Sequence, residues 1–536
     1  MLSLKKWQDH RDEFERAGIG LPTYDVEAVR EAGVAQPRWV HFGGGNLYRA
    51  FHAAVAEKLA CAGKLDCGVV VCETFSPFTI DSVYAPYDNT ILQVVMNADG
   101  SLDERVLAST CDSLFCNPSR PADYDRMGRY FESDELQLAS FTITEKGYGL
   151  TNAAGELLPF VAAEIAGGPE TAASTMGIVC ALLLRRFEAG AAPIAMLSTD
   201  NFSQNGRRFR EAVLTVANGW RDNGHVSDEF VAWLSDESKV SFPWSMIDRI
   251  TPNPSTETEA ALREQGFEDL PLIPNGPVNF AGFANTEACH YLVVEDSFPN
   301  GRPALEEGGV IMCDRDTAEK ADTMKVTACL NPLHTCLAVF GCLLGHTRIW
   351  QEMEDADLAS VVRHLGYDED LPVVVDPGVI DPKSFIDELV GKRLPNKSLP
   401  DAPQRIAQDT SQKIPVRYGH TLASYVAAGK DVSTLTYIPL TIAGWLRYLL
   451  AVDDRGQAFE PSPDPMLADL QARLSGIELG CKDAERVHAA LAPILSNKEI
   501  FVVDLAEVGL AAKVEDLFMQ LVAGPGAVAA TLRKFA

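Results

Sequence analysis

A lysine, an asparagine and a histidine in one apolar segment have the chemistry that oxidation of an alcohol to a carbonyl requires. Lys325, Asn331 and His334 occur in Lys-Val-Thr-Ala-Cys-Leu-Asn-Pro-Leu-His. The reaction needs a base for the hydroxyl proton and donors for the developing oxyanion. A lysine is a suitable base when burial or nearby cations depress its pKa. The structural alternative is that Asn331 caps a helix, with Pro332 at its first position, and that His334 is a core histidine.

Two other polar segments each follow a short apolar run. Thr144 and Glu145 lie in Thr-Ile-Thr-Glu-Lys-Gly-Tyr (142–148), and Asn201 ends Ser-Thr-Asp-Asn (198–201). In open α/β sheets, ligands collect at the carboxyl ends of the strands, so both segments are candidate site loops. The same residue types form turns and helix caps elsewhere, and that alternative stays open.

A glycine-rich turn after the first apolar run suggests a dinucleotide site. Gly43 and Gly45 fit the first two positions of the G-x-G-x-x-G fingerprint, while Tyr48 stands at the third. The first glycine permits the tight turn, and the second permits close approach of the backbone to a pyrophosphate. A glycine turn that binds nothing is the alternative, and for G-x-G alone it is the commoner case.

The residues around this turn extend the hypothesis. A helix N-terminus attracts phosphate, and Arg49 would add a cation there. The second apolar run ends at Glu73, whose carboxylate would hold a ribose 2′-hydroxyl and repel a 2′-phosphate, so the predicted cofactor is NAD rather than NADP. The predicted cofactor-binding residues are Gly43, Gly45, Asn46, Leu47, Arg49, Glu73, Thr144 and Glu145.

Basic residues gather in two segments of the second half, 393–397 and 409–417. Four cations, Arg393, Lys397, Lys413 and Arg417, would suit a carboxylate or polar substrate. An i,i+4 surface ion pair between Asp409 and Lys413 is the simpler interpretation.

Apolar runs and helical patterns alternate through the first three hundred residues. Strands are predicted over 38–42, 68–72, 138–143, 193–198 and 290–295, with helices over 46–62 and 171–189. This rhythm is typical of βαβ units and a mostly parallel sheet. Beyond it only long helical periods occur, over 331–352, 402–428, 435–452, 483–496 and 513–535. We predict an α/β, Rossmann-like domain over 1–304 and a mainly α-helical substrate domain over 305–536.

Composition excludes several classes of protein. The chain has 536 residues, with 46 Lys and Arg against 75 Asp and Glu, a formal net charge of −29. Nucleic-acid and anionic-membrane binding usually leave a basic footprint, so neither partner is expected. The 12 cysteines form no C-x-x-C pair, which disfavours a zinc site or a disulfide scaffold and favours a reducing cytoplasm. The N-terminal segment has no apolar h-region, and no apolar run reaches about 18 residues, so we expect a soluble, cytoplasmic protein.

Motifs along most of the chain resemble the polyol-specific long-chain dehydrogenase family. The matching segments are residues 40–52, 144–148, 198–201, Met-Ile-Asp-Arg-Ile-Thr-Pro (246–252), Glu-Asp-Ser-Phe-Pro-Asn-Gly-Arg-Pro (295–303), 325–334 and Asp-Thr-Ser-Gln-Lys-Ile-Pro (409–415). Each is weak alone, but they occur in the family's order from about residue 38 to 417. The resemblance implies a Rossmann-like N-terminal domain, a helical C-terminal domain, a site in the cleft between them, and NAD(P) without a metal.

The resemblance also implies roles for individual residues. Lys325 matches the family's base, Asn201 and Asn331 its oxyanion hole, and His334 its supporting histidine. Glu145 matches an acidic residue near the proton exit. Lys397 stands where many relatives have a proline after the asparagine, and it would recognise a sugar-acid carboxylate. The implied substrate-binding residues are Asp248, Asn396, Lys397, Lys413 and Arg417.

The spacing of the base departs from the family pattern. The usual spacing is Lys-x4-Asn-x2-His, whereas five residues separate Lys325 from Asn331 here. On one continuous α-helix Lys325 would point about opposite to His334, and the usual spacing would put them about 80° apart. Thr327 would then share the face of Asn331. Because Pro332 disfavours helical geometry at Asn331, we expect the chain to break there and absorb the extra residue, which keeps Lys325 as the base.

The Cys-Leu-Asn-Pro-Leu-His-Thr segment (329–335) is more similar to the family's fructuronate reductases than to its mannitol dehydrogenases. The resemblance therefore implies NAD-dependent interconversion of D-mannonate and D-fructuronate, with hydride passing between substrate C5 and nicotinamide C4. The alternatives are a mannitol- or arabinitol-type polyol 2-dehydrogenase, a tagaturonate reductase, a non-catalytic NAD-binding sensor, and an NAD-using lyase or epimerase. The expected partner is a small sugar acid or polyol, and the expected state is a monomer or small homo-oligomer.

Overall fold

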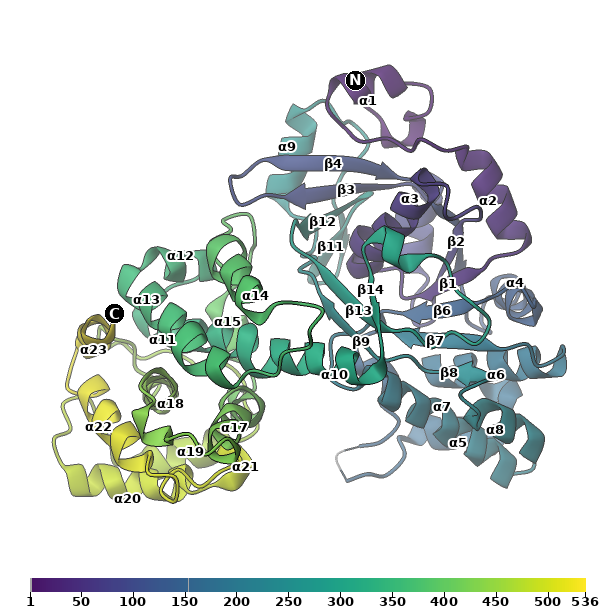
Figure 1. The fold of residues 1–536 in the computed structure, drawn as a ribbon. Helices are drawn as coiled ribbons and strands as arrows, with labels where there is room; N and C mark the ends of the chain where they lie inside the picture. The colour runs from purple at the N-terminus through teal and green to yellow at the C-terminus, as the bar shows by residue number, and fades with distance from the viewer. Residues whose placement is uncertain (1, 153) are drawn as a thin grey trace. The chain divides into compact units, whose positions relative to one another are not determined.

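The computed structural model describes residues 2–152 and 154–536. The chain forms two compact units (Figure 1). Unit 1 comprises Met1–Asn97 and Ser101–Glu319, and unit 2 comprises Ala98–Gly100 and Lys320–Ala536. Each unit is described by itself below.

Six parallel strands form the central sheet of unit 1, in the order β5-β2-β1-β6-β7-β8. Their bounds are β1 Trp39–Phe42, β2 Val69–Glu73, β5 Thr110–Phe115, β6 Leu138–Phe141, β7 Ile194–Ser198 and β8 Val240–Ser241. Numbered along the chain, this is the order 3-2-1-4-5-6 of a doubly wound dinucleotide-binding sheet, whose ligand site lies where the strand order reverses. That point is the carboxyl edge of β1 and β6. The predicted Rossmann-like fold is confirmed.

Helices cover both faces of this sheet, which explains why its strands are apolar on both sides. Val40, Val70 and Cys72 belong to one core, and Trp39 and Val69 to the other. The first core includes residues of α4 (Pro121–Glu132), α6 (Thr175–Glu188) and α7 (Asn205–Asp222), and the second those of α3 (Ala53–Cys61). The other α-helices of unit 1 are α1 Arg11–Arg16, α2 Val26–Ala35, α5 Pro159–Gly167, α8 Asp228–Ser235 and α9 Thr256–Glu264.

Three smaller sheets complete unit 1. Their strands are β3 Ile91–Met96, β4 Leu102–Leu107, β9 Ser245–Asp248, β10 Ile273–Asn275, β11 Val278–Phe280, β12 Phe283–Glu287, β13 Tyr291–Glu295 and β14 Ile311–Cys313. The strand predicted over 290–295 is β13, which pairs with β9 and β14 rather than with the parallel sheet. Because β14 pairs with β13, and Leu305 and Val310 enter the core beside α3, unit 1 continues past the predicted boundary at 304.

Unit 2 is helical, as the periodicity predicted. Its helices are α11 Asn331–Leu344, α12 Ile349–Glu354, α13 Ala356–His364, α14 Pro382–Glu388, α15 Pro403–Ile406, α16 Thr410–Ile414, α17 His420–Ala427, α18 Tyr437–Tyr448, α19 Leu467–Leu474, α20 Ala484–Leu495, α21 Lys498–Phe501, α22 Ala511–Leu521 and α23 Ala527–Phe535. The helix predicted over 331–352 ends at Leu344 because Gly345 caps it in the left-handed conformation, at φ 82°.

A long helical run precedes and includes α11. α10 (Arg315–Met324) leads into the π-helical segment Lys325–Cys329 and then into α11. The run Arg315–Leu344 is long and apolar enough to span a membrane, but 72% of its most apolar window is buried inside the protein, which is the environment of a core helix.

Candidate active site

Gly43 and Gly45, the two glycines of the dinucleotide fingerprint in unit 1, are required for different structural reasons. Gly43 has φ 97°, and a Cβ there would lie 2.1 Å from the carbonyl oxygen of Thr142 in the loop after β6. A Cβ on Gly45 would meet no protein atom within 4 Å, so open space faces the backbone there. The protein's own packing therefore requires Gly43, while Gly45 leaves room for a ligand at the start of the helix over 46–61.

Tyr48 fills the place of the third glycine. It is fully buried, its ring lies 4.5 Å from that of His41, and its hydroxyl is 2.9 Å from Thr110 Oγ1. A third glycine normally lets the helix pack closely on the strand. Here a π-helical segment, Tyr48–His52, begins at the tyrosine, so the helix departs from regular α geometry where the bulky ring enters.

Glu73 lies at the glycine turn, as the spacing predicted. Its Oε1 accepts a hydrogen bond of 2.8 Å from the Gly44 N–H. Burial raises the pKa of Glu73 to about 7, and the Gly44 N–H opposes this shift. A carboxylate at the end of β2 and beside the turn fits recognition of a ribose hydroxyl.

Arg49 is buried, which does not support the phosphate-binding role predicted for it. Its side chain is 1% exposed, and Nη2 donates to the carbonyl oxygen of Ala281 at 2.6 Å. Burial lowers its pKa to about 10. Asn46 and Leu47, at the start of the helix, are half-buried, and Asn46 Nδ2 donates to Asn253 Oδ1 at 3.2 Å.

A buried carboxylate, Asp200, holds the loop after β6. It accepts hydrogen bonds from the N–H groups of Ile143 at 3.0 Å and Thr144 at 2.7 Å, and from the Tyr148 hydroxyl at 2.8 Å. These bonds keep Thr144 at φ 65°, a conformation rare for threonine and typical of functional loops. Asp200 belongs to the polar segment 198–201, but no motif in the sequence pointed to this role.

Asn201 follows Asp200 directly and is exposed at this edge of the sheet. Glu145 is also exposed and forms an ion pair with Arg208. Asp248 ends β9 and is buried.

In unit 2, the π-helical segment Lys325–Cys329 accounts for the unusual spacing of the base. The Leu330 N–H donates to the Lys325 carbonyl oxygen at 3.1 Å, five residues back. A π turn holds one residue more than an α turn. The nine positions from Lys325 to His334 therefore count as eight α positions, about 80°, which is the angle of the usual family spacing. The Thr327 carbonyl oxygen accepts from Thr421 Oγ1 at 3.0 Å, so this part of the turn is satisfied by a side chain.

The chain is irregular one residue earlier than predicted. Leu330, with φ −124° and ψ −61°, precedes the first turn of α11, and Asn331 is the first helical residue rather than the cap. Lys325 is 2% exposed, and its Nζ lies 3.5 Å from Asp322 Oδ1.

His334 is held by a carboxylate that sequence reasoning missed. Its Nε2 lies 3.1 Å from Asp401 Oδ2, and Arg405 Nη2 lies 2.7 Å from Asp401 Oδ1. Burial opposes ionisation of Asp401, but the nearby side chains of His334 and Arg405 lower its pKa to about 2. Asp401 is therefore an anion at neutral pH and lies beside the imidazole.

Two predicted cations gather near this group. Arg417 donates to the hydroxyl of Thr335, which in turn donates to the Asn331 carbonyl oxygen at 3.0 Å. Lys413 Nζ donates to the Ile406 carbonyl oxygen at 2.9 Å. Burial, followed by the charges of Arg417 and Arg405, lowers the pKa of Lys413 to about 8.

The structure places Lys397 elsewhere. Its side chain is 62% exposed, Nζ lies 2.6 Å from Glu354, and it stacks over Trp350. It is thus a paired surface lysine, an environment that does not support the carboxylate-binding role predicted for it. Asn396 is buried, and its Oδ1 accepts from the Ser398 N–H at 2.9 Å.

Comparisons with known proteins agree with these observations. The model of the mannitol dehydrogenase Rossmann domain matches residues 37–307, and that of the mannitol dehydrogenase C-terminal domain matches residues 319–522. D-Mannonate oxidoreductase of Thermotoga maritima is 46% identical over 98% of this chain and 97% of its own length. Mannitol 2-dehydrogenase of Pyrenophora tritici-repentis is 31% identical over 85% of this chain and 75% of its own.

Two solved structures share the fold over nearly the whole chain. D-Sorbitol dehydrogenase in substrate-free form has a TM-score of 0.79 and 26% identity, and covers 96% of this chain and 98% of its own. Mannitol 2-dehydrogenase of Pseudomonas fluorescens, in a ternary complex with NAD and D-mannitol, has a TM-score of 0.69 and 26% identity, with 97% and 96% covered. The predicted resemblance is confirmed: the chain belongs to the mannitol dehydrogenase family of oxidoreductases.

Proposed function

We propose that this protein is an NAD-dependent oxidoreductase that interconverts D-mannonate and D-fructuronate. The observation that carries the proposal is the basic group in unit 2, defined as Arg405, Lys413 and Arg417, next to His334 and Asn331. A neutral polyol needs no such group, whereas a sugar acid carries a carboxylate that it would bind. The 46% identity to D-mannonate oxidoreductase supports the same substrate.

The glycine turn fits a dinucleotide. The open space at Gly45 leaves room for the phosphates, and the helix N-terminus at Asn46 offers them N–H donors. The carboxylate of Glu73 is an acceptor for a ribose hydroxyl. Gly43 and Leu47 flank this turn in the sequence, and Thr144 and Glu145 belong to the loop after β6, whose Thr142 carbonyl oxygen faces Gly43. When bound, the cofactor supplies the hydride acceptor, NAD⁺, for oxidation of the alcohol and the hydride donor, NADH, for reduction of the carbonyl.

The residues of unit 2 perform the proton chemistry. Lys325 takes the hydroxyl proton of the alcohol and returns it in the reverse direction, because it is buried and matches the position of the family's base. The Asn331 side-chain amide donates to the substrate oxygen as negative charge develops there. The family resemblance gives Asn201 the same role, and Asp248 and Asn396 remain proposed substrate-binding residues. His334, oriented by Asp401, supports the base.

Steady-state oxidation of NADH, followed at 340 nm with D-fructuronate, D-tagaturonate and D-fructose, tests this function, with NADPH as the control for the cofactor. We expect turnover on D-fructuronate. Turnover on D-tagaturonate or D-fructose alone would move the assignment to a tagaturonate reductase or a polyol dehydrogenase.

A matched pair of lysine variants tests the basic group. Lys413→Ala should raise the KM for the sugar acid by about tenfold or more, which is the loss of one charge-assisted contact. Lys397→Ala removes a lysine that is already paired with Glu354 and should leave KM unchanged. Equal effects of the two variants would contradict the assignment.

NADH binding without turnover of any substrate would instead support a non-catalytic sensor.

We further propose that the protein acts in the cytoplasm, as a monomer or small homo-oligomer. All 12 cysteines are free thiols, which suits a reducing compartment. Sedimentation equilibrium of the full chain measures the oligomeric state.

A further inference from the structure

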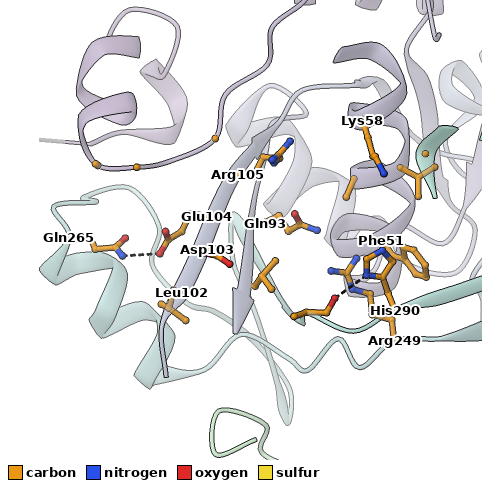
Figure 2. A pocket seen from close by; sticks show the side chains of 18 residues that line it. Phe51, Lys58, Gln93, Leu102, Asp103, Glu104, Arg105, Arg249, Gln265 and His290 are labelled. Carbon is orange, nitrogen blue, oxygen red and sulfur yellow. Dashed lines mark hydrogen bonds between the residues drawn. The ribbon is translucent and has the colours of Figure 1, made fainter. Parts of the chain in front are cut away.

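A cavity of about 830 Å3 lies in unit 1, and none of the residues assigned to the cofactor lines it (Figure 2). One wall is a face of the β3–β4 hairpin, where Gln93 pairs with Arg105 and Val95 with Asp103. Ala54 and Lys58 of α3, one helical turn apart, also line it. Its volume is within the range of sites that hold small organic ligands, about 300–1,000 Å3.

Three cations, Lys58, Arg105 and Arg249, line this cavity, and none of them forms an ion pair with a carboxylate of the described residues. Among the residues that the structure describes, the exposed side chains of Lys58 and Arg105 form no ion pair or side-chain hydrogen bond. The two terminal nitrogens of Arg249 donate to the main-chain carbonyl oxygens of Ala50, at 3.0 Å, and Glu287, at 3.1 Å. Burial lowers the pKa of Arg249 to about 10, so it is still a cation at neutral pH. Figure 2 shows the three side chains around the same space.

The two acidic residues of the lining are engaged elsewhere. Glu104 Oε1 accepts a hydrogen bond of 2.8 Å from Gln265 Nε2, and Asp103 Oδ2 accepts one of 2.9 Å from Asn97 Nδ2. The lining therefore carries three cations and two carboxylates, in a chain of formal net charge −29, and the buried carboxylates of Glu287 and Glu57 interact electrostatically with Arg249 and Arg105. Three cations that face one cavity form a local basic site in an acidic protein, and an anion would bind there.

We propose that this cavity binds a small multivalent anion, either a phosphate ester or a polycarboxylate, between Lys58, Arg105 and Arg249. Phosphate and carboxylate oxygens both match these donors, and guanidinium groups bind either in a bidentate manner. The site is separate from the dinucleotide turn and does not depend on turnover.

Calorimetric titration of the full chain with pyrophosphate and, separately, with citrate tests the proposal and distinguishes the two sources of anion. Both titrations are made at constant ionic strength with NADH present, so that the glycine turn is occupied. We expect one saturable site for at least one probe. The double variant Lys58→Ala/Arg105→Ala should weaken its Kd at least about tenfold, and Asp103→Asn should strengthen it.

Lys64→Ala is the matched control, because Lys64 is a lysine just beyond α3 that is paired with Glu307. It should bind the probe as the wild type does. Absence of saturable binding, or full retention of binding by the double variant, would overturn the proposal. Binding lost only when NADH is added would assign the probe to the glycine turn instead, which also overturns it. If NADH itself fails to bind, the double variant still tests the cavity without it, so the two proposals fail separately. Thermal unfolding of each variant confirms that it is folded.

Discussion

The carboxyl edge of the parallel sheet and the helical run Arg315–Leu344 both carry proposed site residues, but they position them by different means. At the sheet edge, the main chain forms most of the proposed site. Gly43 allows the tight turn after β1, Gly45 leaves open space, and the N–H groups of the loop after β6 donate to Asp200. In the helical run, side chains are positioned by other side chains: Lys325 lies beside Asp322, and His334 beside Asp401, which is distant in sequence. The glycine turn follows from local sequence, whereas the contacts of His334 and of the loop N–H groups depend on the packing of distant segments.

The largest effect is expected from the helical side. Lys325→Ala removes the proposed base and should lower kcat by about 10²–10⁴-fold, the usual contribution of general acid–base catalysis. The Kd of NADH, measured by fluorescence, should not change, because the glycine turn belongs to unit 1. Loss of NADH binding together with kcat would show that the variant has lost more than a base.

On the sheet side, two glycine substitutions should separate folding from binding. Gly43→Ala forces a Cβ to 2.1 Å from the Thr142 carbonyl oxygen at a positive φ, and should lower the free energy of unfolding by about 3 kcal/mol. Chemical denaturation followed by circular dichroism measures this.

Gly45→Ala is the matched variant. Its Cβ meets no protein atom, so the free energy of unfolding should change by less than about 1 kcal/mol, while NADH binding weakens about tenfold. If Gly45→Ala destabilised the fold as much as Gly43→Ala, the open space would not be a ligand site.

The smallest effects are expected from pH, and they have opposite signs in the two regions. The pKa of Glu73 is raised to about 7, so its carboxylate forms as pH rises through 7 and the Kd of NADH should fall a few-fold. The pKa of Lys413 is lowered to about 8, so its charge is lost as pH rises through 8 and the KM for the sugar acid should increase. Binding of both ligands is then best between pH 7 and 8.

Two variants test which residue causes each of these pH dependences. Glu73→Gln should remove the pH dependence of NADH binding, and Lys413→Arg, which keeps its charge, should remove that of KM. A Kd for NADH that is as pH-dependent in Glu73→Gln as in the wild type would exclude Glu73 as its origin.

Prediction from sequence succeeded where the signal was local and failed where it was not. The strands, the glycine turn and Glu73 follow from short motifs and from the order of elements. The burial of Arg49 could not be predicted because a motif does not reveal which side of a helix meets the core, particularly where a π-helical segment begins at Tyr48. The Asp401–His334 contact joins distant segments, and the surface pairing of Lys397 with Glu354 depends on two separate segments packing together, so neither leaves a pattern in the sequence. Unit 1 extends to Glu319, beyond the boundary predicted near 304, because it includes β14, a strand too short to be recognised in the sequence.

The π-helical segment beginning at Lys325 has a consequence for how this helix tolerates insertions and deletions. An extra residue in a regular α-helix rotates everything beyond it by about 100° and would turn the histidine away from its carboxylate. Confined to a single wide turn, the same residue changes the length of the chain without rotating the rest of the helix. By this geometry, the chain can gain or lose one amino acid at this point and still keep Lys325, Asn331 and His334 on one face.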